Sequence, residues 1–195
     1  LAGVWAQDRF NESIVPILYS VVHSDFTYVL YLVSLTLVMG GTFLLNQLED
    51  IETDRLNHKL FLIADGEISE RNAIIETILI VVLPIIYFLF IRIDLAVMLV
   101  ISFIVMGWFY SSKPFVLKDK PIGGIVANVL GGYIVFSFGW MIYGSPSWNM
   151  ILHATPYALG MQAVYFFTTI PDMVGDEKVN KITIAVKFSR KFVLW

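Results

Sequence analysis

Cysteine is absent from this 195-residue sequence, which excludes disulfide bonds and metal sites built from thiolates. Charged residues are also scarce, at 15% of the chain, whereas soluble domains average about 25%. Basic residues are fewer than acidic ones, and the net charge of −3 argues against a nucleic-acid partner. A chain with so little charge is poorly suited to cover a surface that faces water.

Apolar residues are in excess, at 57% of the chain with a mean hydropathy of +0.75. They form long blocks, and a block of roughly 20 such residues matches the bilayer core. The blocks cover residues 14–23, 27–46, 73–91, 95–110, 122–143 and 151–170. We therefore predict an all-α, multi-pass transmembrane helical bundle with about six spans in this chain.

Basic residues mark one side of this predicted bundle. Nearly all of them lie in three long polar connections, at residues 46–72, 111–121 and 171–191, whereas the two short connections hold only Arg92. Alternate connections of a helical bundle lie on the same side of the membrane, and Lys and Arg favour the cytoplasmic side. We therefore predict that the three basic connections, and the residues that begin and end them, face the cytoplasm.

Carboxylates recur at a spacing of four where two of the spans end. Asn46, Asp50 and Asp54 close the second span, and Asp172 and Asp176 follow the sixth. On a helix this spacing places side chains on one face. A divalent cation relieves the repulsion between such carboxylates, and Mg2+ bridging to a diphosphate is the usual case. One pair alone could equally be a solvated loop, but two pairs on the same predicted side indicate one shared site.

The connection at residues 111–121 supplies cations and follows a phenol. A diphosphate carries several negative charges, and donors aimed at its leaving oxygens stabilise the charge that develops there. We predict this role for Tyr110 and Lys118, and we interpret Lys120 as an ordinary anchor on the basic side of the membrane.

Together these motifs resemble the UbiA family of intramembrane prenyltransferases. The matching pieces are Asn46-x3-Asp50-x3-Asp54-Arg55, Asn57, Gly66-Glu67-Ile68-Ser69, Tyr110-Ser111-x2-Pro114 with Lys118, and Asp172-x2-Gly175-Asp176 with Thr183 and Ala185-Val186. They appear in the order of the family and cover nearly the whole chain from Thr27 onward. The resemblance implies a bundle of about nine helices around a central cavity in a full-length member.

The resemblance also implies a reaction and the residues that perform it. An isoprenyl diphosphate donor would ionise to an allylic carbocation, which an aromatic or other lipophilic acceptor attacks, with Mg2+ as cofactor and the membrane lipid as surroundings. The implied metal ligands are Asn46, Asp50, Asp54, Asp172 and Asp176, and the four aspartates are the implied catalytic residues. The implied diphosphate contacts are Asn46, Arg55, Tyr110, Lys118 and Lys178.

The sequence departs from the family pattern in several places. Residues 58–65 lack two prolines that many relatives carry, Val116 stands where a basic residue is common, and Asn180 stands where glycine is common. Within the family, the first motif looks closest to the homogentisate branch, although the acceptor stays open. The chain also ends before the last helices of the family, so we expect one membrane-embedded domain over residues 1–195 that is cut short at its C-terminal end.

A transporter or channel that uses the aspartates to carry ions is the main alternative, because acidic residues within membranes often mark ion paths. The acidic residues here lie at the ends of spans rather than at their centres, and a basic connection suited to a diphosphate accompanies them. These two features favour the enzyme.

Overall fold

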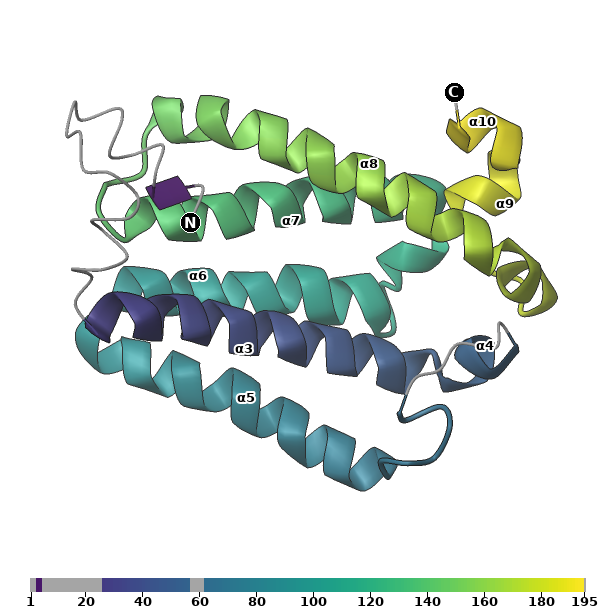
Figure 1. The fold of residues 1–195 in the computed structure, drawn as a ribbon, viewed down its shortest axis with the longest axis horizontal. Coiled ribbons are helices and arrows are strands. Elements are labelled where there is room, and N and C mark those ends of the chain that lie inside the picture. Colours follow the sequence, from purple (N-terminus) through teal and green to yellow (C-terminus); the bar gives the residue numbers. More distant parts are fainter. Residues whose placement is uncertain (1–2, 5–25, 57–61, 195) are drawn as a thin grey trace.

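The computed structural model describes residues 3–4, 26–56 and 62–194, and every element within these ranges is helical (Figure 1). The prediction of an all-α fold is therefore confirmed, while the predicted span at 14–23 lies outside the described residues. In chain order the elements are α3 (Phe26–Glu49), α4 (Ile51–Leu56), α5 (Glu70–Ile91), α6 (Ile93–Phe103), the π-helix η1 (Ile104–Phe109), the 3-10 turn η2 (Leu117–Asp119), α7 (Pro121–Met141), α8 (Trp148–Lys178), α9 (Ile184–Phe188) and α10 (Arg190–Leu194).

Three of these helices are long and apolar enough to cross a membrane. They are Tyr28–Glu49, Glu70–Ile91 and Pro121–Met141, and a shorter apolar helix covers Ile93–Phe109. Large apolar side chains on α5 face outward, including Leu83 at 60% and Phe90 at 87% exposed, as expected for a lipid-facing helix. The predicted span at 151–170 lies within α8, a helix of 31 residues that is less apolar than these three.

Local sequence determines where the long helices begin and how closely they pack. Ser69 caps α5 and Ser147 caps α8, each accepting a backbone N–H three residues later, and Pro121 occupies the first turn of α7. A Cβ on Gly132 would lie 2.5 Å from the Cα of Ala158 in α8. Glycine at this position therefore allows α7 and α8 to pack with their backbones in close contact.

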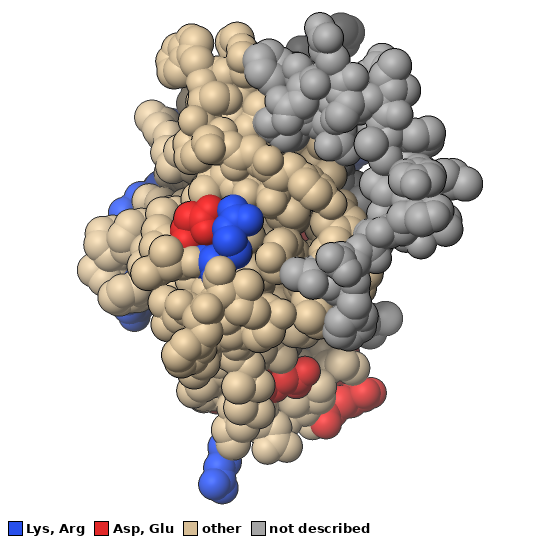
Figure 2. Space-filling model, turned by 90° about the vertical axis from the view of Figure 1, so that its left-hand side faces the viewer, with Lys and Arg blue, Asp and Glu red and all other residues tan. Residues whose placement is uncertain are grey.

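Helices α3, α5, α6, α7 and α8 run side by side, and α3 and α8 end at the same end of the bundle, where α4, α9 and α10 also lie (Figure 1). The short α5–α6 and α7–α8 connections lie at the opposite end. That end is tied together by Arg92, which pairs with Asp94 at 2.8 Å and donates to the Met141 carbonyl at 2.8 Å. Most of the described surface at this end is uncharged (Figure 2).

The packed core lies toward the end that holds the short α5–α6 and α7–α8 connections. Its fully buried large side chains are Trp140, Phe88, Phe138, Leu95, Leu99 and Val38. Four of these belong to the last turns of α5 and α7 or the first turns of α6, next to the short connections. Asp50, Asp172 and Asp176 lie toward the opposite end, where α3 and α8 finish, and this division places the candidate site.

Candidate active site

A cavity of about 460 Å3 opens at the end of the bundle where α3 and α8 finish. It brings together six residues singled out from the sequence, which are Asn46, Asp50, Tyr110, Lys118, Asp172 and Asp176. Carboxylates from both acidic motifs thus line one cavity, although Asp50 and Asp172 lie 122 positions apart along the chain. The same wall also carries Asp119, Tyr165 and Lys181.

The first motif does not lie on one uninterrupted helix, which corrects the prediction drawn from its spacing. Helix α3 ends at Glu49, Asp50 is non-helical, and α4 starts at the next residue. The backbone N–H of Asp54 still donates to the Asp50 carbonyl at 2.8 Å, so the chain keeps a helix-like turn across the break. Asn46 donates from its side-chain amide to Ser111 at 3.1 Å, which joins the motif to the residue after Tyr110.

Asp50 is the centre of the charged network. Its Oδ2 accepts from Lys118 Nζ at 2.7 Å and its Oδ1 accepts from Lys181 Nζ at 2.5 Å. Burial acts to raise the pKa of Asp50, but the two ammonium groups together lower it below its ordinary value. Burial lowers the pKa of Lys118, and Asp50 offsets this only in part. Burial acts in the same direction on Lys181, but its acidic neighbours outweigh it and raise the pKa of this lysine.

The second motif lies in the last turns of α8. Asn180 ends the helix with a φ of 60°, a left-handed conformation that asparagine tolerates and glycine adopts freely. The chain then turns back, and the backbone N–H of Lys181 donates to the Asp176 carbonyl at 2.9 Å. Burial, with further contributions from Asp172 and Asp50, raises the pKa of Asp176 to about 6, although Lys181 acts to lower it.

Three predicted residues lie away from this cavity. Asp54 is buried in α4 and does not line it. Arg55 turns toward the following loop, where its Nε–H donates to the Ala64 carbonyl at 2.7 Å. Lys178 is exposed in the last turn of α8. The resemblance assigned a role to each of them, and those roles stay predictions.

Sequence reasoning missed Lys181, Asp119 and Tyr165. Lys181 was grouped with the basic residues that mark the membrane side, yet it follows the second motif by only five positions. Asp119 is adjacent to Lys118, and its Oδ1 lies 3.8 Å from Lys181 Nζ. The hydroxyl of Tyr165 is buried without a hydrogen-bond partner among the described residues, and it packs against Gly124, where a Cβ would lie only 1.9 Å away.

Apolar cavities extend from the acidic one into the bundle. A cavity of about 690 Å3 shares Tyr110, Tyr165 and Thr168 with it and continues along α8 to Tyr157 and Met161. A smaller one of about 140 Å3 shares Tyr157 and Met161 and runs along α7 from Gly132 to Gly139. The series forms a mainly apolar path leading away from the carboxylates, with room for an extended hydrocarbon chain.

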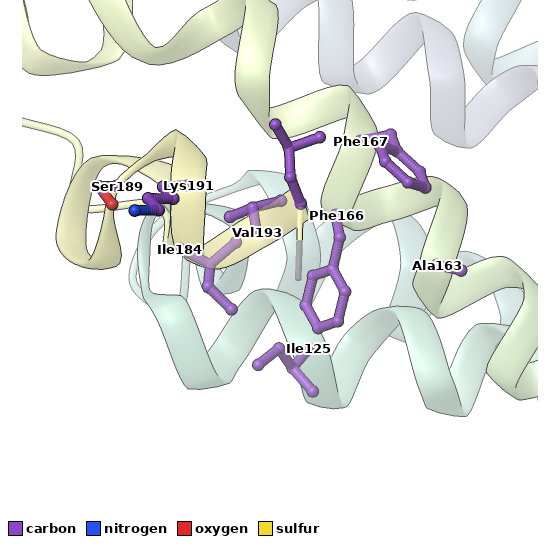
Figure 3. A pocket seen from close by; sticks show the side chains of 9 residues that line it. Ile125, Ala163, Phe166, Phe167, Ile184, Ser189, Lys191 and Val193 are labelled. Atoms are coloured by element: carbon purple, nitrogen blue, oxygen red, sulfur yellow. The ribbon is translucent and has the colours of Figure 1, made fainter.

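A separate apolar groove of about 900 Å3 lies on another side of α8, between α7, α9 and α10 (Figure 3). Phe166, Ile184 and Val193 point into it, and Lys191 is the only charged residue among the described residues that line it. Although this groove is larger, it holds none of the acidic residues, so it does not supply the chemistry that the motifs indicate.

The acidic cavity fits Mg2+ only when another group supplies ligands. Within residues 3–4, 26–56 and 62–194, no three acidic or histidine side chains converge closely enough to hold a metal ion by themselves. Four carboxylates and two ammonium groups line the cavity, so it carries an excess of negative charge. Mg2+ commonly binds through one or two carboxylates and the phosphate oxygens of a substrate, and this arrangement suits that mode.

Comparison with known proteins gave three findings. The family model described as the UbiA prenyltransferase family matches residues 16–195. A digeranylgeranylglyceryl phosphate synthase from Methanococcus aeolicus is 28% identical over 160 residues, which cover 80% of this chain and 54% of that protein. A UbiA homologue from Archaeoglobus fulgidus, solved with DMAPP and Mg2+, has a similar fold with a TM-score of 0.74 at 24% identity.

The coverage of these relatives is unequal. The match to the solved structure covers 98% of this chain and 66% of that one, and the chain spans about half the length of the Methanococcus synthase. The family match supports the resemblance drawn from the motifs. The Methanococcus relative is a digeranylgeranylglyceryl phosphate synthase, and the finer resemblance to the homogentisate branch has no support from the comparisons.

Proposed function

Because the chain belongs to the UbiA prenyltransferase family, we propose that it transfers a prenyl group from an isoprenyl diphosphate to a lipophilic acceptor within the membrane. The observation that carries this proposal is the single cavity lined by carboxylates of both motifs and by two lysines, which continues into an apolar cavity. The charged part suits a diphosphate with its cations, and the apolar part suits the hydrocarbon chain attached to it.

In this proposal the diphosphate lies at one end of the bundle, and the prenyl chain extends from it between the helices. Asn46, Asp50, Asp172 and Asp176 hold the cation–diphosphate group at the end of the bundle, with Mg2+ neutralising the diphosphate when it is bound. The bond between the first prenyl carbon and the diphosphate oxygen breaks, and the electron pair leaves with the oxygen. Lys118 and the hydroxyl of Tyr110 then stabilise the charge on that oxygen.

The apolar cavity would protect the allylic cation that remains. Tyr157, Tyr165 and Met161 line it, and aromatic faces attract cations while apolar walls exclude water. The nucleophilic atom of the acceptor forms the new bond to the first prenyl carbon, and its proton passes to the released diphosphate. Asp54, Arg55 and Lys178 do not line the cavity, so we propose supporting rather than contacting roles for them in this conformation.

Placement in the membrane is part of the same proposal. Chain connections that carry most of the described basic residues lie at the end where α3 and α8 finish, and we propose that this end faces the cytoplasm. We also propose that the chain forms one membrane-embedded domain. The acceptor is either an aromatic compound, as the first motif suggested, or a prenylated glycerol phosphate, as the name of the Methanococcus relative suggests.

The proposal is tested by binding of a geranylgeranyl diphosphate analogue to the purified whole protein, with and without Mg2+. Asp50→Ala and Asp172→Ala should each abolish Mg2+-dependent binding, because each removes a carboxylate from a different motif. If the wild type ignores the diphosphate in both conditions, the proposal is wrong, and ion flux through the same variants becomes the next measurement. If binding holds, homogentisate and geranylgeranylglyceryl phosphate are compared as acceptors.

A further inference from the structure

We propose that Lys118 and Lys181 occupy the place of the metal at Asp50 in the metal-free protein, and transfer to the diphosphate when it arrives with its cation. Metal alone then binds weakly, and diphosphate binding makes the site able to hold it. This inference rests on the proposed function, since it concerns the same site, and it gives Lys181 a role that the sequence motifs did not assign to it.

Geometry at Asp50 carries the first step. Both carboxylate oxygens already accept a hydrogen bond from an ammonium, at 2.7 Å from Lys118 and 2.5 Å from Lys181. The three side chains are only 9%, 15% and 14% exposed for Lys118, Lys181 and Asp50, so little water screens them. Mg2+ binds carboxylate oxygen at about 2.1 Å. An ammonium 2.5 Å from the same oxygen would then lie at most about 4.6 Å from the metal. Repulsion at that distance makes the metal and the lysines competitors.

The rest of the cavity offers a lone metal ion too few protein ligands to displace the two lysines from Asp50. Among the residues that the structure describes, no group of three acidic or histidine side chains is close enough to hold a cation without help. A metal ion that arrives alone must therefore displace two ammonium groups and finds few protein ligands in return. A metal ion that arrives with a diphosphate brings additional oxygen ligands, and the same diphosphate offers the two ammonium groups a new partner.

The backbone around Lys181 is positioned for such a transfer. Its N–H donates to the Asp176 carbonyl at 2.9 Å, and the N–H of Ile182 donates to the Asp119 carbonyl at 3.3 Å. The base of the side chain is thus fixed between the second motif and the turn that carries Lys118. The side-chain Oδ1 of Asp119 lies 3.8 Å from Lys181 Nζ and has no hydrogen bond among the described residues. Asp119 can therefore keep the ammonium inside the cavity while it leaves Asp50.

The proposal predicts that neutralising either lysine strengthens the binding of a metal ion alone and weakens the binding of the diphosphate. Mn2+ serves as a paramagnetic substitute for Mg2+, and its free concentration is followed by electron paramagnetic resonance with the purified whole protein. Without diphosphate, Lys181→Met and Lys118→Met should each bind Mn2+ about fivefold or more tightly than the wild type. With Mg2+ present, the same variants should bind a non-hydrolysable geranylgeranyl diphosphate analogue about fivefold or more weakly.

Matched controls isolate the charge at Asp50. Lys120→Met removes a basic side chain from the same turn, but Lys120 is exposed and does not line the cavity, so both affinities should stay at their wild-type values. Lys181→Arg keeps the charge and should leave Mn2+ binding weak. If the methionine variants do not fold, Lys181→Gln and Lys118→Gln provide a second neutral pair for the same titration.

The outcomes separate this inference from the proposed function. Neutral variants that bind Mn2+ no better than the wild type would overturn the competition between metal and lysine, even if diphosphate binding is normal. Neutral variants that bind Mn2+ more tightly but bind the diphosphate as well as the wild type would overturn the transfer. A wild type that ignores the diphosphate would contradict the proposed function, while the Mn2+ titration would still report the competition.

Discussion

Asp176→Asn should stabilise the metal-free protein near neutral pH, although it removes a residue proposed to serve the reaction. Asp176 is only 6% exposed and lies beyond the apolar part of α8. Burial, Asp172 and Asp50 raise its pKa to about 6, from an ordinary value of 3.8. A raised pKa in the folded state means that the folded chain binds a proton more readily than the unfolded chain. The stability from this proton is present below pH 3.8 and is lost as the pH rises through about 6.

The size of the effect follows from the shift. The two pKa values differ by 6 − 3.8 = 2.2, and each unit corresponds to about 1.36 kcal/mol, so ionised Asp176 costs up to about 3 kcal/mol above pH 7. At pH 4.5 Asp176 is still protonated in the folded state but largely ionised in the unfolded chain, and this difference lowers the free energy of unfolding by about 1 kcal/mol. The difference of about 2 kcal/mol corresponds to roughly 4–8 °C in melting temperature for a chain of this size.

Thermal unfolding in detergent measures this difference directly. The gap in Tm between Asp176→Asn and the wild type should favour the variant and widen by roughly 4–8 °C between pH 4.5 and pH 7.5. Asp65→Asn, which neutralises an exposed loop carboxylate, controls for the change in net charge. A gap that is independent of pH, or a variant that is less stable at pH 7.5, would refute the reasoning. Mg2+ with diphosphate should then stabilise the wild type more than the variant.

Further predictions concern the cavity and the opposite end of the bundle. Gly160 lines the cavity of about 690 Å3, and a Cβ on it would meet nothing within 4 Å. Gly160→Phe should therefore lower kcat/KM for geranylgeranyl diphosphate relative to dimethylallyl diphosphate at least about tenfold, because burial of the longer prenyl chain contributes about 0.8 kcal/mol per CH2. An unchanged ratio would show that the prenyl chain does not bind in this cavity. Tyr165→Phe should leave Tm unchanged or higher but weaken diphosphate binding, because the hydroxyl is buried and has no hydrogen-bond partner within the described part of the chain. Arg92→Ala should lower stability by about 1–3 kcal/mol through loss of its bonds to Asp94 and the Met141 carbonyl, with diphosphate affinity as the unaffected control.

Hydropathy was sufficient to predict the long helices, because each must satisfy its own backbone in lipid. The short connection at 91–94 was also predicted correctly, because two apolar runs meet there and the only polar residues between them are Arg92 and Asp94. The break in the helix at Asp50 was not predicted. Its spacing of four to Asp54 is the same in a continuous helix and in two helices joined by one non-helical residue, so periodicity could not distinguish them.

Site residues that belong to a sequence motif were predicted, whereas residues that reach the site only through folding were missed. Asp50 and Asp172 were found because each lies in a repeated pattern at the end of an apolar run. Lys181 was not, because its role depends on contact with a carboxylate 131 residues away. Arg55 shows the reverse, since it lies within the first motif, yet a carbonyl nine residues later holds its side chain.

The distribution of packing explains how such a site persists. Fully buried side chains such as Trp140, Phe88 and Leu95 gather at the end with the short connections, while the carboxylates of the site line a cavity at the other end. Burial, and to a lesser extent neighbouring carboxylates, makes an ionised carboxylate destabilising, as the raised pKa of Asp176 indicates. The lysines at Asp50 relieve part of this cost without removing it, and a cation bound with diphosphate can relieve the rest. Ligand binding should therefore stabilise the end of the bundle that is least stable without it, and hydrogen exchange should slow in α4, α9 and the end of α8 before it changes near Trp140.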